Sequence, residues 1–214
     1  PGFDVVHYKG DLISPKVHNL GQVPEMMWVK ASSSTDGVAA NQNWKVYHKG
    51  LDGGSSPETK YLVLSSNNAE NNGVNAWNST VPTAKHFFVS KDGDDAETNY
   101  NQYSIEYTAM LFSSVAGLSK IGSYTGTGVA GLSITTGFQP RFVLVKRVDS
   151  TSNWNMFDSL RGMSSGSTSA LYLNDTDFAA SLDWCNATST GFDLPTTNVN
   201  MNASSGEYIY YAHA

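Results

Sequence analysis

The stretch Asn19–Lys30, NLGQVPEMMWVK, is written a second time at Thr135–Lys146 as TTGFQPRFVLVK. In each copy a glycine and a proline precede a short apolar run, and the run stops at a lysine. A short apolar run bounded by turn residues predicts a strand that is buried on both faces or lies at the centre of a sandwich. Its recurrence predicts that the chain contains one structural unit twice.

Other segments repeat in the same order on either side of the middle of the chain. The matching pairs are Val6–Gly10 with Gly122–Gly126, Asn43–Tyr47 with Asn153–Phe157, Lys60–Leu64 with Ser169–Leu173, and Tyr107–Ala109 with Tyr210–Ala212. This order predicts an internal duplication of roughly one hundred residues. The halves are 1–116 and 117–214, with the seam near Ser113–Lys120.

The residue pattern predicts an all-β fold. Aromatic and β-branched segments alternate with Gly, Asn and Asp turn signals about every ten residues, and no stretch has helical periodicity. We therefore expect a β-sandwich of about twelve to fourteen antiparallel strands. Because no proline-rich or charged linker marks the seam, the favoured interpretation is one sandwich domain over 1–214. Two separate small sandwiches are the alternative.

Composition excludes several classes of protein. The chain of 214 residues has a net charge of -6 with only 13 Lys and Arg, and no basic run that would indicate nucleic-acid binding. No stretch of about 18 apolar residues predicts membrane insertion. Cys185 is the only cysteine, which excludes an internal disulfide, and we expect it to be buried. A start at Pro1 without methionine is expected of a piece of a longer or processed chain.

The sequence predicts a protein that is not an enzyme. Sandwich glycosidases place two carboxylates across a cleft, whereas Glu106 and Glu207 have no second acid two or four residues away. No G-x-S-x-G elbow occurs, and the five histidines lack metal-ligand spacing. A depolymerase whose carboxylates come from distant strands is the alternative.

Two acidic segments are candidates for a calcium site. Asp92, Asp94 and Asp95 cluster within KDGDDAETN, and Asp175 lies close to a further aspartate in LNDTDF. Clustered carboxylate oxygens suit Ca²⁺, although neither segment has EF-hand spacing. Solvated acidic turns are the alternative interpretation, and no other cofactor is expected.

The tryptophans that recur in the two halves are expected to be core or corner residues. Trp44 matches Trp154, and Trp77 approximately matches Trp184. A repeated aromatic favours a packing role, although an exposed one could stack on a sugar. We expect Trp28 in the core as well, and a structural role for the recurring Lys30 and Lys146.

A ligand site is expected in the loops where the two copies differ, because loops on a rigid scaffold carry function. These loops are 32–43, 53–58, 67–78 and 164–169. The candidate ligand-binding residues are Asp36, Asn41, Asn72, Asn75, Trp77 and Ser165.

Taken together, the elements VHYKG, LGQVPEMMWVK, NWKVYHKGL, YLVLSSNNA and YIYYAHA resemble a repeated β-domain of phage tail and tail-fibre proteins, especially from phages of marine bacteria. The resemblance covers essentially the whole chain, and its specificity lies in the order and duplication of short motifs. It implies a lectin-like β-sandwich of the concanavalin or jelly-roll type, at the distal end of a virion appendage.

The resemblance also implies a function. We expect non-catalytic recognition of a host-surface receptor, a glycan or a protein, by an extracellular virion protein. Other tail-fibre segments would be its partners, and the full fibre would be a homotrimer. The alternatives are a structural or oligomerisation module of the appendage, and a carbohydrate-binding module of a secreted bacterial protein.

Overall fold

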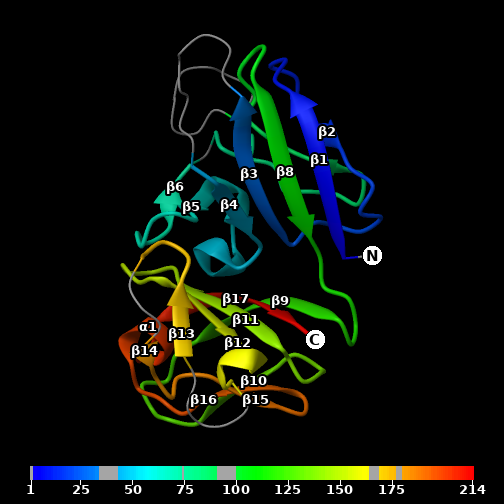
Figure 1. Ribbon diagram of the computed structural model, residues 1–214. Coiled ribbons are helices and arrows are strands. Elements are labelled where there is room, and N and C mark those ends of the chain that lie inside the picture. The colour runs from blue at the N-terminus through cyan, green and yellow to red at the C-terminus, as the bar shows by residue number, and fades with distance from the viewer. Residues whose placement is uncertain (1, 34–42, 74, 91–99, 164–168, 177–179) are drawn as a thin grey trace. The chain divides into compact units, whose positions relative to one another are not determined.

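The computed structural model describes residues 2–33, 43–73, 75–90, 100–163, 169–176 and 180–214 (Figure 1). Its contacts divide the chain into two compact units. Unit 1 comprises Pro1–Leu64 and Glu70–Ser113, and unit 2 comprises Ser65–Ala69 and Ser114–Ala214. The passage from Ser113 to Ser114 falls at the predicted seam. The assignment of 1–214 as a single domain stays a prediction.

Unit 1 is built on a six-stranded sheet with the order β1-β8-β3-β4-β5-β6, in which every pairing is antiparallel (Figure 1). The strands are β1 (Phe3–Lys9), β8 (Glu106–Phe112), β3 (Met26–Ser33), β4 (Lys45–His48), β5 (Lys60–Val63) and β6 (Asn71–Asn72). A two-stranded sheet pairs β2 (Lys16–Val17) with β7 (His86–Phe87). Two short 3-10 turns, η1 (Leu51–Gly54) and η2 (Pro57–Thr59), lie between β4 and β5.

One face of the large sheet forms the core of unit 1. Residues on β8 alternate between buried and partly exposed, as expected for a strand with period two. Tyr107, Ala109 and Leu111 therefore pack with Met27 of β3 and with Phe87 of the small sheet. We call this the core face, and we call the opposite side, which carries Trp28, Lys30, Thr108 and Met110, the second face.

Unit 2 repeats this plan. Its six-stranded antiparallel sheet has the order β14-β13-β12-β11-β17-β9. The strands are β14 (Ala180–Ser181), β13 (Ser169–Tyr172), β12 (Trp154–Asp158), β11 (Phe142–Arg147), β17 (Glu207–His213) and β9 (Ser119–Thr125). A three-stranded sheet contains β10 (Leu132–Thr135), β16 (Gly191–Leu194) and β15 (Asn186–Thr188). The turn η3 (Ser159–Arg161) follows β12, and α1 (Val199–Asn202) precedes β17.

The core of unit 2 lies where its two sheets contribute apolar side chains to one cluster. Val143 and Tyr210 of the large sheet pack in the same cluster as Ile134 and Phe192 of the small sheet. Cys185 belongs to this cluster and has no exposed surface, which confirms the prediction that it is buried. Each unit therefore has its own core.

The two units share one strand order, as the predicted duplication requires. The order β1-β8-β3-β4-β5-β6 in unit 1 corresponds strand by strand to the order β9-β17-β11-β12-β13-β14 in unit 2. Two hydrogen bonds recur at matched positions: Leu64 N donates to Trp44 O at 3.0 Å, and Leu173 N donates to Trp154 O at 3.2 Å. The match of Asn43–Tyr47 with Asn153–Phe157 is therefore correct.

The predicted match for the last strand of each half was wrong. Val29 pairs with Ala109, and its equivalent Val145 pairs with Tyr210. Ala109 therefore corresponds to Tyr210 and not to Ala212. With this register Tyr107 is the equivalent of Tyr208, and each tyrosine stacks on a tyrosine of the neighbouring edge strand. The ring centroids of Tyr8 and Tyr107 are 5.2 Å apart, and those of Tyr124 and Tyr208 are 4.8 Å apart.

The corrected register explains the repeated glycine of VHYKG and GSYTG. A Cβ atom at Gly10 would lie 1.8 Å from the carbonyl oxygen of Gln102, and one at Gly126 would lie 2.2 Å from that of Ala203. Only glycine allows the backbone to approach so closely. The two glycines thus hold the same contact in both units.

The segment that each glycine approaches also contains a repeated buried asparagine, Asn101 before Gln102 and Asn202 before Ala203. The Asn101 side chain accepts from Asp11 N and donates to Ile13 O. The Asn202 side chain accepts from Thr127 N and donates to Val129 O. Both asparagines have no exposed surface. Each one satisfies backbone groups of the loop that leaves the first strand of its unit.

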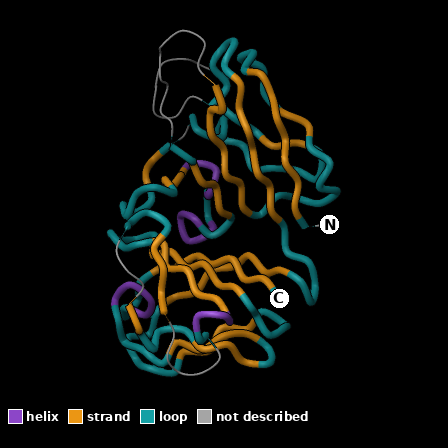
Figure 2. The backbone as a smooth tube through the Cα atoms, in the orientation of Figure 1, coloured by secondary structure: helices purple, strands orange, loops and turns teal. Residues whose placement is uncertain are grey.

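The predicted all-β class is confirmed, since strands make up most of the regular secondary structure of the described residues and pair antiparallel within each sheet (Figure 2). The concanavalin or jelly-roll topology stays a prediction. Within the described ranges, no helix has the length and apolar character needed to cross a membrane.

Candidate functional site

Most of the predicted site residues lie outside the described residues. These are Asp36, Asn41 and Ser165 of the ligand set, and Asp92, Asp94 and Asp95 of the calcium set. Among the residues that the structure does describe, no three His, Cys, Asp or Glu side chains are grouped so that they could hold a metal ion. The calcium site stays a prediction.

The structure describes three of the predicted ligand residues, Asn72, Asn75 and Trp77. Asn72 is exposed on β6, and its Oδ1 accepts from Lys60 Nζ at 2.9 Å. Asn75 is exposed in the following turn. Trp77 has no exposed surface, and its indole N–H donates to Lys60 O at 2.8 Å. The interpretation of Trp77 as a ligand-binding residue is therefore corrected: it is a core residue, as its repetition indicated.

A hollow of about 320 Å³ lies on the second face of unit 1. Its lining residues come from β3, β8 and the residue before β4, and they are Lys30, Ala31, Ser32, Trp44, Thr108 and Met110. Lys30 and Thr108 are direct partners in the β3–β8 register, so their side chains leave the sheet on the same side. The sheet thus presents an ammonium, two hydroxyls, a thioether and an indole to one small volume.

The polar side chains of this hollow are positioned by neighbours. Lys30 Nζ lies 5.9 Å from the centre of the Trp44 ring, within the range of a cation–π contact. The Thr108 hydroxyl lies 3.3 Å from His7 Nδ1, and His7 Nε2 lies 3.4 Å from a carboxylate oxygen of Glu106. These two contacts, from Glu106 to His7 and from His7 to Thr108, hold the Thr108 side chain at one wall of the hollow.

Apolar side chains continue along the second face beyond the hollow. Met110 pairs with Trp28 on one side and with Val5 on the other. The Phe112 ring lies 5.1 Å from that of Trp28 and 5.0 Å from that of Phe3. Phe3 is 51% exposed and Val5 is 50% exposed. The hollow therefore lies at the polar end of a partly exposed aromatic stripe.

The equivalent place in unit 2 is filled. Lys146 corresponds to Lys30 and is paired in register with Trp154, the counterpart of Trp44. Neither Lys146 nor Trp154 is more than 1% exposed. The backbone carbonyl of Asn67, in the segment Ser65–Ala69 that belongs to unit 2, lies 3.4 Å from Lys146 Nζ and accepts from Ser152 N at 2.8 Å.

Burial gives Lys146 an unusual pKa. Desolvation lowers the pKa of its ammonium to about 7, and the nearby Asp149 carboxylate opposes this only in part. Its Nζ also donates to the carbonyl oxygen of Arg147 at 2.5 Å. Lys146 is thus a structural lysine, as predicted from its recurrence, whereas Lys30 lines a hollow.

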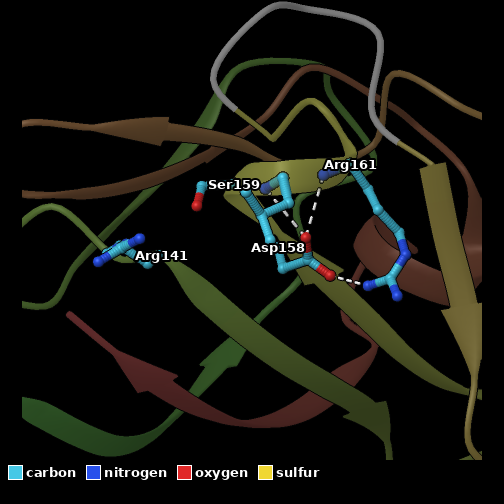
Figure 3. A pocket seen from close by; sticks show the side chains of 5 residues that line it. Arg141, Asp158, Ser159 and Arg161 are labelled. Atoms are coloured by element: carbon cyan, nitrogen blue, oxygen red, sulfur yellow. Dashed lines mark hydrogen bonds and ion pairs between the residues drawn. The ribbon is translucent and has the colours of Figure 1, made fainter.

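Unit 2 has a hollow of its own, of about 310 Å³, lined by Arg141, Asp158, Ser159, Leu160 and Arg161 (Figure 3). Asp158 caps η3 by accepting from the backbone N–H groups of Leu160 and Arg161, each at 3.0 Å, and it pairs with the Arg161 guanidinium. Figure 3 shows the Arg141 side chain apart from this network.

This second hollow also marks a difference between the copies. Ser159 N donates to Arg141 O at 2.9 Å, and the same bond in unit 1 joins Lys49 N to Glu25 O at 2.9 Å. In unit 1 the two side chains form an ion pair with Lys49 Nζ 2.5 Å from Glu25 Oε1. Arginine and serine at these places cannot form that pair, which leaves the hollow of unit 2 between them.

The described lining of the two hollows does not provide the pair of groups that glycoside hydrolysis needs. The described residues around the unit 1 hollow include no carboxylate, and those around the unit 2 hollow include only Asp158, which is already engaged by Arg161 and by the cap of η3. General acid–base catalysis on a sugar requires two carboxylates that face each other. What these two hollows offer is hydrogen bonding, a cation and an aromatic face.

Sequence reasoning missed the Lys30–Trp44 site because it assigned Trp44 to the core from its recurrence. Trp154 is buried, whereas Trp44, the residue before β4, is only partly buried and lines the hollow. The assignment of Trp28 to the core is wrong, since Trp28 is only partly buried on the second face.

Comparison with known proteins gives one match. A family model described as a domain of unknown function, DUF7483, matches residues 1–214. The chain belongs to this family. No curated protein and no solved structure matches it.

Proposed function

We propose that this DUF7483 chain is a non-catalytic recognition module of a phage tail fibre, and that it binds glycans of the host surface through the Lys30–Trp44 hollow. The observation that carries the proposal is the partly exposed Trp44 beside Lys30, at a place where the other unit is closed. An aromatic face beside hydrogen-bonding groups matches the amphipathic surface of a sugar ring.

The size and chemistry of the hollow fit this role. Small-molecule pockets occupy roughly 300–1,000 Å³, and the hollow of about 320 Å³ lies at the lower end of that range. Lys30 donates hydrogen bonds, while Ser32 and Thr108 can both donate and accept. Met110 and Trp44 supply apolar contact. Such a site recognises one or two sugar residues of a longer glycan.

Replacement of Trp44 by alanine is expected to weaken glycan binding by at least about tenfold, which corresponds to about 1.4 kcal/mol, because a tryptophan contact dominates a small interface. The purified chain is tested on an array of bacterial surface polysaccharides, and affinities for the positive glycans are then measured by titration calorimetry. Tyr103→Ala is the matched control, since Tyr103 is 71% exposed and does not line the hollow.

Equal binding by the Trp44→Ala and Tyr103→Ala proteins would contradict the proposed site. Binding to no glycan at all would contradict the proposed function, and a stable oligomer in a solution mass measurement would then favour the structural module. Release of reducing ends from a bound polysaccharide would show that the module is an enzyme.

A further inference from the structure

The filled site of unit 2 shows which chemical group the open hollow of unit 1 is built to receive. Lys30 and Trp44 have the same places in their sheet as Lys146 and Trp154, as the recurring bonds from Leu64 and Leu173 establish. In unit 2 the lysine donates to its neighbour's carbonyl oxygen, that of Arg147, and the group brought to it from a distant part of the chain is the carbonyl oxygen of Asn67, 3.4 Å from Nζ. That oxygen belongs to a secondary amide.

From this correspondence, and resting on the proposed glycan function, we infer that the hollow of unit 1 selects sugars that carry an acetamido group. An acetamido substituent is also a secondary amide, with a carbonyl oxygen, an N–H group and a methyl group. Its carbonyl would accept from Lys30, as the Asn67 carbonyl accepts from Lys146. Among the described residues that line the hollow, Lys30 is the one cation.

The remaining lining residues complement the rest of the substituent. The Thr108 hydroxyl, held by His7, can accept from the amide N–H. Met110 and Trp44 provide the apolar surface that a methyl group requires. A hydroxyl in place of the acetamido group would leave this apolar wall without contact.

An acidic sugar and a peptide are the competing ligands. A carboxylate would pair with Lys30 but would not use the apolar wall. A peptide would reproduce the amide of Asn67 but would not need the partly exposed indole of Trp44. The acetamido sugar is the ligand that uses the cation, the hydroxyls, the apolar wall and the aromatic face together.

The test compares ligands that differ in one substituent. Oligomers of N-acetylglucosamine and N-acetylgalactosamine are titrated against the whole chain, beside glucose and galactose oligomers of the same length and linkage. Oligomers of galacturonic acid and the peptide SSNNA, the sequence of Ser65–Ala69, form the other two arms. We expect an acetamido oligomer to bind at least about tenfold more tightly than its hydroxyl counterpart.

Two lysine variants identify the group that reads the substituent. Lys30→Met keeps the length of the side chain but removes the donor, and it is expected to reduce the preference for the acetamido oligomer to about twofold or less. Lys85→Met is the control, because Lys85 is exposed and does not line the hollow. It is expected to retain the full preference.

The outcomes separate this inference from the proposed function. Glycan binding that depends on Trp44 but shows no preference for acetamido sugars overturns the inference alone, as does tighter binding of the galacturonic acid oligomer or of the peptide. A preference that survives Lys30→Met also overturns it. Absence of binding by every oligomer overturns the proposed function and the inference together.

Discussion

The Asn202→Ala protein is expected to lose about 3 to 5 kcal/mol of the free energy of unfolding of unit 2, because each buried polar group left without a partner costs about 1–3 kcal/mol. The Asn202 side chain accepts from Thr127 N at 2.8 Å, and it donates to Val129 O at 2.8 Å and to Thr196 O at 2.9 Å. Alanine leaves Thr127 N and Thr196 O without this partner, while Val129 O keeps only the bond from the Thr127 hydroxyl at 3.1 Å. The Asn202 side chain itself has no exposed surface.

Urea unfolding followed by circular dichroism measures this loss. The control is Asn75→Ala, which removes an exposed asparagine and is expected to change stability by no more than about 0.5 kcal/mol. Amide hydrogen exchange then locates the effect. Exchange should rise in β9 and β17 of unit 2, while β1 and β8 of unit 1 keep their protection.

The equivalent variant of unit 1 provides an internal comparison. Asn101 accepts from Asp11 N at the longer distance of 3.3 Å and donates to Ile13 O at 2.9 Å. Asn101→Ala should likewise destabilise its own unit, by at least about 2 to 3 kcal/mol, because these two backbone groups lose their partner. If Asn202→Ala were as stable as Asn75→Ala, the buried asparagine would not hold the loop as described.

The fold was predictable from the sequence where identical residues recur within strongly patterned strands. Lys30 and Lys146 end equivalent buried runs, and Asn43 and Asn153 precede equivalent tryptophans, so these strands align without ambiguity. The last strand was misaligned by two positions, because several tyrosines of similar size lie close together in YIYYAHA. The pattern N-x-x-S-x-E-Y, present at 101–107 and 202–208, would have given the correct register.

The candidate site was less predictable, because recurrence fixes the place of a residue in a sheet but not what covers it. Trp44 and Trp154 have equivalent positions, yet only Trp154 is fully buried. In unit 2 the segment Ser65–Ala69 brings a carbonyl to Lys146, and this segment follows a strand of unit 1 in the chain. A contact made by a segment from the other half of the sequence has no counterpart in the repeat, so the repeated pattern cannot predict it.

Lys146 is expected to make the free energy of unfolding increase as the pH rises. Its pKa is about 7 in the folded chain, against about 10.4 for an unfolded lysine. Between these values the unfolded state binds the proton and the folded state does not. Lys146 therefore makes the free energy of unfolding rise with pH, and its contribution between pH 7 and pH 9 is expected to be about 2 kcal/mol.

Other buried groups oppose this rise at higher pH. Burial raises the pKa of the Cys185 thiol and of tyrosines such as Tyr124. In the unfolded chain a cysteine ionises from about pH 8.5 and a tyrosine from about pH 10, while in the folded chain both stay neutral, which lowers stability there. The difference between the wild-type chain and a Lys146 variant, measured by urea unfolding at pH 6, 7, 8 and 9, therefore isolates the contribution of the lysine.

Lys146→Met should remove the rise and increase stability at pH 6 by about 2 kcal/mol, because methionine fills the same volume without a charge to desolvate. The gain is smaller than the full desolvation cost, since the Arg147 carbonyl loses its bond from Lys146 Nζ while the Asn67 carbonyl keeps the bond from Ser152 N. Lys120→Met, at a partly exposed place in the same unit, should leave the pH dependence unchanged. A Lys146→Met protein that kept the wild-type pH dependence would show that another group, and not the buried lysine, titrates on unfolding.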